Sequence, residues 1–177
     1  KERNLIIDTG MNMEACRAAM MAVVKELQID LGQTDFYITH LHVDHLGLVG
    51  ELAAASAHIF FNEPDAEILA RNSFWEFLFQ TALQHGFSQK ELEEAMAAHP
   101  VQRYRAAGPF DFELLKEGDC LSCGPYSFTC IHTPGHTPGH LCLYEPVQKL
   151  LISGDHILGD ITPNMSAWDN RENTLKI

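Results

Sequence analysis

Short apolar runs and amphipathic stretches alternate along the first third of the chain. The run Leu5-Ile6-Ile7 stops at Asp8-Thr9-Gly10, as expected of a buried strand followed by a turn. The apolar positions that follow recur at helical spacing, so a helix is predicted from an N-cap at Asn12 to about residue 30, with Gly32 closing it.

The same alternation continues to residue 61. Residues 36–39 and 58–61 are predicted strands, and a helix rich in Leu, Val and Ala is predicted between them, from residue 46 to about 57. Strands that alternate with helices indicate an α/β fold with buried strands.

Residues 62–108 break this rhythm and predict a helical insertion. Residues 62–65 have the form of a helix start, the helical pattern runs to about Leu83, and Ser88 to Glu91 has capping-box form ahead of a second helix. The insertion carries an aromatic cluster, which consists of Phe74, Trp75, Phe77 and Phe79. These rings could pack on the sheet, form a lid or pocket wall, or make a dimer surface.

Four more strands are predicted after the insertion. They cover residues 110–115, 126–132, 141–144 and 150–153, with turns between them. The pair Cys120 and Cys123 has redox or zinc-knuckle spacing, but a turn before a strand is the favoured interpretation. No linker composition divides the chain, so residues 1–177 are expected to form a single domain or most of one.

Composition narrows the function classes. Twelve Lys and Arg against 24 Asp and Glu give a formal net charge of −12, which disfavours binding to a nucleic-acid backbone. No apolar run reaches the length of a membrane span, and no signal peptide is recognisable at the start. The 5 cysteines lack disulfide-framework spacing, so we expect reduced thiols in a cytoplasmic protein.

Metal-binding residue types are concentrated directly after the predicted strand at 36–39. His40, His42, Asp44 and His45 fall within six consecutive positions. Zinc and similar metals take imidazole nitrogens and carboxylate oxygens. Residues two apart in an extended segment point to the same side, so His40 and His42 can hold one ion, while the next two side chains could reach a second. A solvated His-rich loop is the alternative.

This stretch has the form H-x-H-x-D-H, the signature of the metallo-β-lactamase superfamily, and the resemblance extends well beyond it. Residues 6–10 look like the early strand and turn of that family. Residues 133–140, Thr-Pro-Gly-His-Thr-Pro-Gly-His, look like its second metal motif in the form common among glyoxalase II-like hydrolases, and residues 153–155 look like its third. The resemblance implies a metallo-β-lactamase-like αββα sandwich with a helical insertion at about 62–108.

The resemblance also implies a site for two divalent ions, most often zinc, with iron or manganese as alternatives. The ligands would be His40, His42 and His136 for the first ion and Asp44, His45 and Asp155 for the second, with Asp155 bridging both. Outside this set, Asp8 could orient an imidazole or only form a turn, and His140 could line the site or simply pack.

The sequence departs from the family pattern in two places. The strand hairpin that usually precedes the Asp-Thr-Gly turn is absent. No histidine follows His156, although the family usually supplies a late histidine to the second metal. We therefore expect a fragment of a longer protein, with one ligand beyond Ile177.

The expected activity is hydrolysis of a small ester, thioester or lactone-like molecule by a metal-bound hydroxide, with Asp44 orienting the hydroxide and relaying its proton. One alternative is a sulfur dioxygenase with a single iron held by His40 or His42, His136 and Asp155. Another is a non-catalytic metal-binding domain that recognises a partner through the insertion. The expected partners are a small-molecule substrate and, through the insertion, a second copy of the chain.

Overall fold

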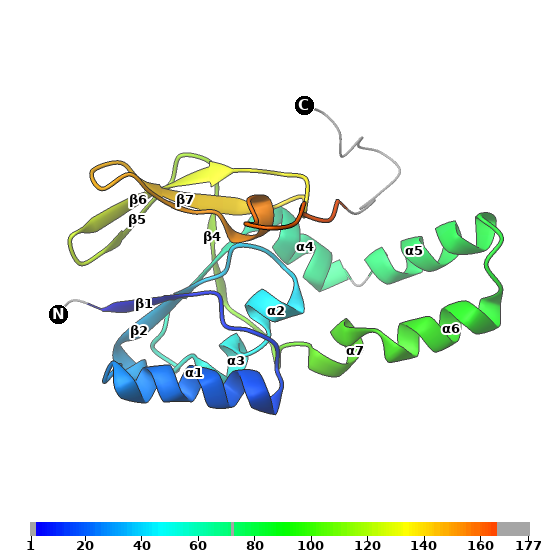
Figure 1. The fold of residues 1–177 in the computed structure, drawn as a ribbon, viewed down its shortest axis with the longest axis horizontal. Coiled ribbons are helices and arrows are strands. Elements are labelled where there is room, and N and C mark those ends of the chain that lie inside the picture. The colour runs from blue at the N-terminus through cyan, green and yellow to red at the C-terminus, as the bar shows by residue number, and fades with distance from the viewer. Residues whose placement is uncertain (1–2, 72, 166–177) are drawn as a thin grey trace.

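The structure is a computed structural model that describes residues 3–71 and 73–165, without the side chains of Ser73 and Phe74. Two four-stranded sheets pack face to face (Figure 1). The first is entirely parallel, in the order β1 (Asn4–Ile7), β2 (Thr34–Tyr37), β3 (Ile59–Asn62) and β4 (Phe112–Leu115). The second is antiparallel and consists of β5 (Cys120–Cys123), β6 (Tyr126–His132), β7 (Leu141–Glu145) and β8 (Leu150–Ile152). The predicted α/β fold class with its two-sheet sandwich is confirmed.

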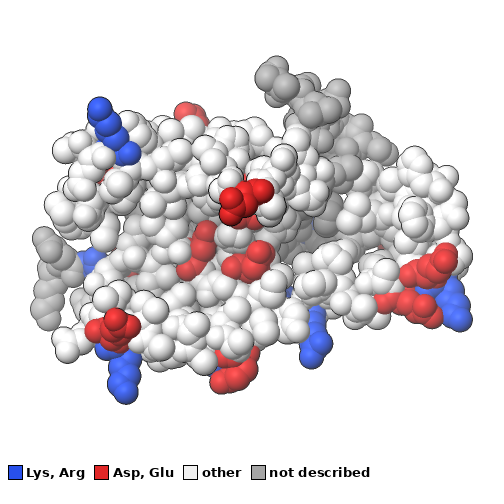
Figure 2. All heavy atoms as spheres, viewed as in Figure 1, with Lys and Arg blue, Asp and Glu red and all other residues white. Residues whose placement is uncertain are grey.

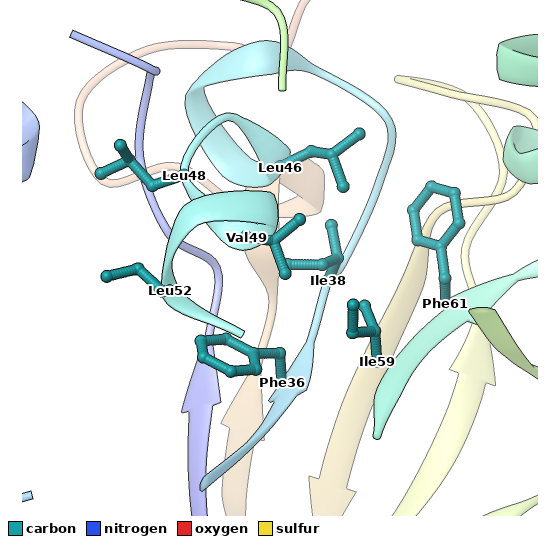
Figure 3. Close-up of a cluster of buried hydrophobic side chains, with 8 residues drawn as sticks. All are labelled: Phe36, Ile38, Leu46, Leu48, Val49, Leu52, Ile59 and Phe61. Carbon is teal, nitrogen blue, oxygen red and sulfur yellow. The ribbon is translucent and has the colours of Figure 1, made fainter. Parts of the chain in front are cut away.

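Alternating side chains of β2 and of Ile38, the residue that follows it, build the core on both faces of the first sheet. Phe36 and Ile38 point to the helices, where they pack with residues of the short helices and of β3 (Figure 3). Tyr37, between them, faces the second sheet, and its hydroxyl donates to the Leu141 carbonyl over 2.7 Å. A strand buried on both faces is the expected centre of such a layered fold.

Three helices cover the outer face of the parallel sheet: α1 (Glu14–Glu26), α2 (Val43–Leu46) and α3 (Val49–Leu52). The predicted cap of α1 was wrong. Met13 is the N-cap and offers no side-chain hydrogen bond, while the Asn12 amide donates to the Arg105 carbonyl at 3.2 Å. Gly32 does not close α1 either, because the helix ends before Gln28 (φ 53°) and Gly32 lies in the separate turn Leu31–Gln33.

The single helix predicted from residue 46 to 57 is replaced by two single turns, α2 and α3. At Gly47 the chain packs against the backbone after β1, where a Cβ atom would lie 2.6 Å from the Gly10 carbonyl oxygen. The Leu48 amide donates to that same oxygen over 3.1 Å. This long-range packing interrupts the helix, and composition alone carried no sign of it.

Residues 120–123 form strand β5, so the turn predicted there was wrong. Leu121 is buried between the sheets, and the two cysteines lie in a hairpin whose turn follows at Gly124 (φ 54°). Cys120 is exposed and Cys123 is half-buried.

The predicted insertion consists of α4 (Glu63–Arg71), α5 (Ser73–Gln84), α6 (Gln89–Ala98) and α7 (Pro100–Tyr104), and it extends to one side of the sheets (Figure 1). The capping box at Ser88 and Glu91 is confirmed. Trp75, Phe77 and Phe79 are half-buried, and the two hydrophobic clusters found among residues 3–71 and 73–165 include none of them. None of the helices in these two ranges is long and apolar enough to cross a membrane.

Candidate metal centre

The metal-binding residue types from distant parts of the sequence meet at one end of the two sheets. His40 and His42 follow β2, and His45 lies in α2. His136 comes from the loop between β6 and β7, and Asp155 from the short turn Gly154–His156 after β8. Each sheet therefore supplies part of the site from loops at its strand ends, where such folds usually hold their functional residues.

Three imidazole nitrogens converge at the centre. His42 Nδ1 lies 3.0 Å from His40 Nε2 and 2.8 Å from His136 Nε2. These residues form a group whose potential ligand atoms all lie within 4.8 Å of one another. The three residues expected at the first metal site are therefore brought together.

Asp155 lies between this group and His45. Its Oδ2 is 3.3 Å from His136 Nε2, and its Oδ1 is 3.3 Å from His45 Nε2. His40, His45 and Asp155 form a second group of potential ligands. Asp44 is more peripheral, because its carboxylate is 3.7 Å from His45 Nε2 and its side chain is half exposed. The Asp155 carboxylate faces both groups and therefore has the placement expected of a bridging ligand.

Hydrogen bonds from outside the two groups determine which ring nitrogens carry protons. The Asp8 carboxylate can only accept, so Thr39 Oγ1 donates to it over 2.9 Å and must accept from His40 Nδ1 at 3.0 Å. His45 Nδ1 likewise donates to Asp8 over 2.8 Å, and His136 Nδ1 donates to the Asn164 carbonyl over 2.7 Å. The Nε2 atoms of these three histidines are therefore left with lone pairs directed at the centre, as metal ligation requires.

The environment also keeps two of these imidazoles, those of His40 and His42, neutral. Burial and the neighbouring imidazoles move the pKa of His40 far below its usual range. Burial, followed by the charge of His136, lowers the pKa of His42 to about 4. A metal binds the neutral form, so these rings need not lose a proton at neutral pH. The converging lone pairs and the Asp155 carboxylate fit a divalent cation.

His45 differs from these two rings. Burial works against its charged form, but the hydrogen bond and charge of Asp8, with the charges of Asp44 and Asp155, outweigh burial and raise its pKa. This negative environment would favour a cation at His45, whether a proton or a metal ion.

Asp8 and His140 have different positions relative to the centre. Asp8 contacts His45 directly and His40 through Thr39, so it has the placement of a residue that orients imidazoles. His140 is fully buried, stacks on the His40 ring with 5.2 Å between centroids, and lies 2.8 Å from Thr133 Oγ1 through Nδ1. His140 belongs to neither potential ligand group, and it packs against the His40 ring.

Asp65, which the sequence marks only as part of a helix start, connects the two ligand loops. It is fully buried and accepts from the Leu41 amide at 3.0 Å, from Thr137 Oγ1 at 2.8 Å and from the Gly139 amide at 2.8 Å. Burial raises the pKa of its carboxyl group. An Asp in the first turn of a helix is so common that its sequence position gave no sign of this role.

Comparison with known proteins agrees with the geometry. The family model of the metallo-beta-lactamase superfamily matches residues 1–176. A hydroxyacylglutathione hydrolase of Bdellovibrio bacteriovorus is 33% identical over 122 residues, which are 69% of this chain and 34% of that protein. The human acyl-coenzyme A thioesterase MBLAC2 is 24% identical over 160 residues, which are 87% of this chain and 54% of that protein.

A solved structure supports the same assignment. A metallo-beta-lactamase family protein from Thermus thermophilus superposes with a TM-score of 0.71 at 28% identity, over 91% of this chain and 53% of that one. The chain thus spans between about a third and just over half the length of these relatives. The match over nearly all residues, together with the ordered motifs and their convergence in space, shows that the chain belongs to the metallo-β-lactamase superfamily.

Proposed function

We propose that the chain carries the metal centre of a hydrolase that acts on a small thioester or ester. The observation that supports this most directly is the convergence of His40, His42 and His136 beside Asp155, with the His40 and His136 rings oriented by partners outside the group. Two of the similar proteins are named as a hydroxyacylglutathione hydrolase and an acyl-coenzyme A thioesterase, and both names describe cleavage of a thioester.

The proposed cofactor is a pair of divalent ions, most often zinc in such donor sets. His40, His42 and His136 would hold the first, and Asp44, His45 and Asp155 would hold the second. When bound there, the ions would polarise the substrate carbonyl and lower the pKa of a water molecule toward neutrality.

The protein side chains would then handle the proton and the substrate. Asp44 is half exposed beside His45, so its carboxylate can orient a water molecule and pass the proton to the leaving group. The surface chemistry also limits the substrate. In the view of Figure 2, some Asp and Glu side chains lie near the middle of the face, where no Lys or Arg is seen, and others lie toward its edges with Lys and Arg. With a net charge of −12, the molecule would repel polyanions such as nucleic acid.

Metal content and a substitution test this function together. The purified protein should contain about two zinc ions per chain and should hydrolyse members of a thioester and ester panel. His42→Ala should remain folded and lose activity by at least ~100-fold, because one of three converging ligands is removed. His85→Ala is the matched control, since His85 is exposed in the loop between α5 and α6.

Two results would contradict this proposal. Full activity of His42→Ala would separate catalysis from the imidazole cluster. One iron ion per chain, together with oxygen uptake, would favour the dioxygenase alternative. The peripheral position of Asp44 is compatible with that alternative, because a site for one ion does not need the Asp44 carboxylate.

A further inference from the structure

A cavity of about 870 Å³ lies between the insertion and the first ligand loop. Ile68 and Leu69 of α4 and Trp75 and Leu78 of α5 form one part of its wall. Another part comes from α7 and the segment after it, which includes Phe110. The volume lies within the range of roughly 300–1,000 Å³ that is typical of small-molecule sites.

The cavity adjoins the candidate metal centre. His42 lines it together with its neighbours Leu41 and Val43, and Asn164, whose carbonyl accepts from His136, lines it as well. A molecule in this cavity would therefore be next to His42, and next to Asn164, the residue that accepts from His136. Trp75 is the member of the aromatic cluster found in this lining, and its position agrees with the pocket-wall use, one of the three that the sequence left open.

The lining is mostly apolar. Aliphatic and aromatic side chains make up most of it, and the Trp75 ring packs edge-on against His99 with 4.8 Å between centroids. The polar side chains in the lining besides His42 are His99, Gln102, Arg105 and Asn164. No Asp, Glu or Lys is among the lining residues found in the described part of the chain. Such a wall gains free energy from burying hydrocarbon, and Arg105 is the one permanently charged side chain among these described lining residues.

We propose that this cavity binds the apolar acyl group of the substrate, with the scissile carbonyl directed toward His42. The inference rests on the proposed function and specifies its substrate class as thioesters or esters of extended apolar acids. Leu78 and Leu69 are then specificity-determining residues, because their side chains line the space that the acyl group would fill.

A chain-length series with a constant leaving group tests the inference. Acetyl, butyryl, hexanoyl and octanoyl thioesters of N-acetylcysteamine would be compared on the metal-loaded protein. Burial of each methylene is worth about fourfold, so kcat/KM should rise by at least ~10-fold from acetyl to octanoyl. Leu78→Trp, which fills the cavity, should abolish the rise from acetyl to octanoyl. Gln80→Trp adds the same ring on the exposed face of α5 and should leave that rise unchanged.

Binding provides a second readout that does not depend on turnover. Octanoate and acetate carry the same carboxylate, so calorimetry of the two isolates the contribution of the hydrocarbon chain. Octanoate should bind at least ~10-fold more tightly, with a negative heat-capacity change. Leu78→Trp should remove the difference. Leu69→Trp, on α4, repeats the test if the first variant does not fold.

The outcomes separate the two proposals. An active enzyme with a flat chain-length series would overturn the acyl site and leave the hydrolase intact. A rise that persists in folded Leu78→Trp and Leu69→Trp would also overturn it. If no thioester or ester is cleaved, the proposed function fails, and calorimetry alone tests the cavity. Octanoate binding that is tighter than acetate binding, with the difference lost in Leu78→Trp, would support an apolar ligand site. Equal binding of octanoate and acetate to wild type would refute it.

Discussion

Asp8 shows how one carboxylate can organise several ligands. It accepts from the Thr39 amide at 2.9 Å and from His45 Nδ1 at 2.8 Å, and it reaches His40 through the Thr39 hydroxyl. The residue holds φ at 56°, in the left-handed region that Asp and Asn tolerate better than other non-glycine residues. Both the turn role and the orienting role considered from the sequence are therefore present in the same residue.

Replacing Asp8 by Asn should weaken metal binding by about 10- to 100-fold, because the neutral amide no longer stabilises the donating imidazoles. Asn tolerates the same left-handed backbone, so the turn should be retained. Competition with a chelator of known affinity measures the effect. Asp111→Asn makes the same chemical change at an exposed position and should bind metal as wild type does. Equal affinity of the Asp8 variant and wild type would show that this carboxylate has no influence on the ligands.

At the residue scale, the sequence predicted which side chains meet but not how their rings are oriented. The ordered motifs identified His40, His42 and His136, which share the centre. The orientation of the His40 and His136 rings depends on Thr39, Asp8 and the Asn164 carbonyl, which approach through folding and carry no pattern in the sequence. His140 is a histidine of the same motif as His136, yet it stacks on the His40 ring.

At the scale of elements, local patterns predicted strands better than helix ends. The strands around the site were expected close to where they lie, because their apolar runs are bounded by turns. The prediction of one helix from residue 46 to 57 was wrong because Gly47 packs against the backbone near Gly10, a contact between segments that are distant in the sequence. The strand β5 was missed because its alternation is short and includes only one buried residue, Leu121.

Asp65 makes an element-scale connection that can be tested. It lies in α4, and its carboxylate holds the loop after β2 through Leu41 and the loop after β6 through Thr137 and Gly139. In Asp65→Asn, an amide nitrogen must replace one oxygen. Either orientation leaves a buried backbone N–H of Leu41 or Gly139 without its acceptor.

We therefore expect Asp65→Asn to lower the free energy of unfolding by about 1–3 kcal/mol, the cost of one buried unsatisfied donor. Urea unfolding at a fixed metal concentration measures this. Glu63→Gln is the control, since it makes the equivalent change at an exposed position of the same helix. A midpoint unchanged from wild type would mean that the two loops hold their positions without the Asp65 carboxylate.

At the scale of the whole molecule, the candidate ligands connect two layers that are also joined by apolar packing and by the hydrogen bond from the Tyr37 hydroxyl to the Leu141 carbonyl. The parallel sheet supplies three histidines from the segment after β2, which are His40, His42 and His45. The antiparallel sheet supplies His136 and Asp155 from its loops. An ion held by both sets would connect the sheets at the end where the site lies. It would also offset part of a net charge of −12, which disfavours a compact state through self-repulsion.

Metal should therefore stabilise the entire fold and not only the site. A cation that binds only the folded protein adds about 2.7 kcal/mol to the free energy of unfolding when its free concentration is 100 times Kd. Urea unfolding in zinc at that concentration and in excess chelator should differ by this amount, with the same dependence on urea concentration in both conditions. His136→Ala removes one of the two candidate ligands that the second sheet supplies, so zinc should give this variant much less stabilisation than it gives wild type.

Equal midpoints for wild type with and without zinc would mean that the histidines do not bind the ion in the folded protein. If His136→Ala gained as much stability from zinc as wild type does, His136 would not bind the ion, and of the two candidate ligands from the second sheet only Asp155 would be left to connect the layers.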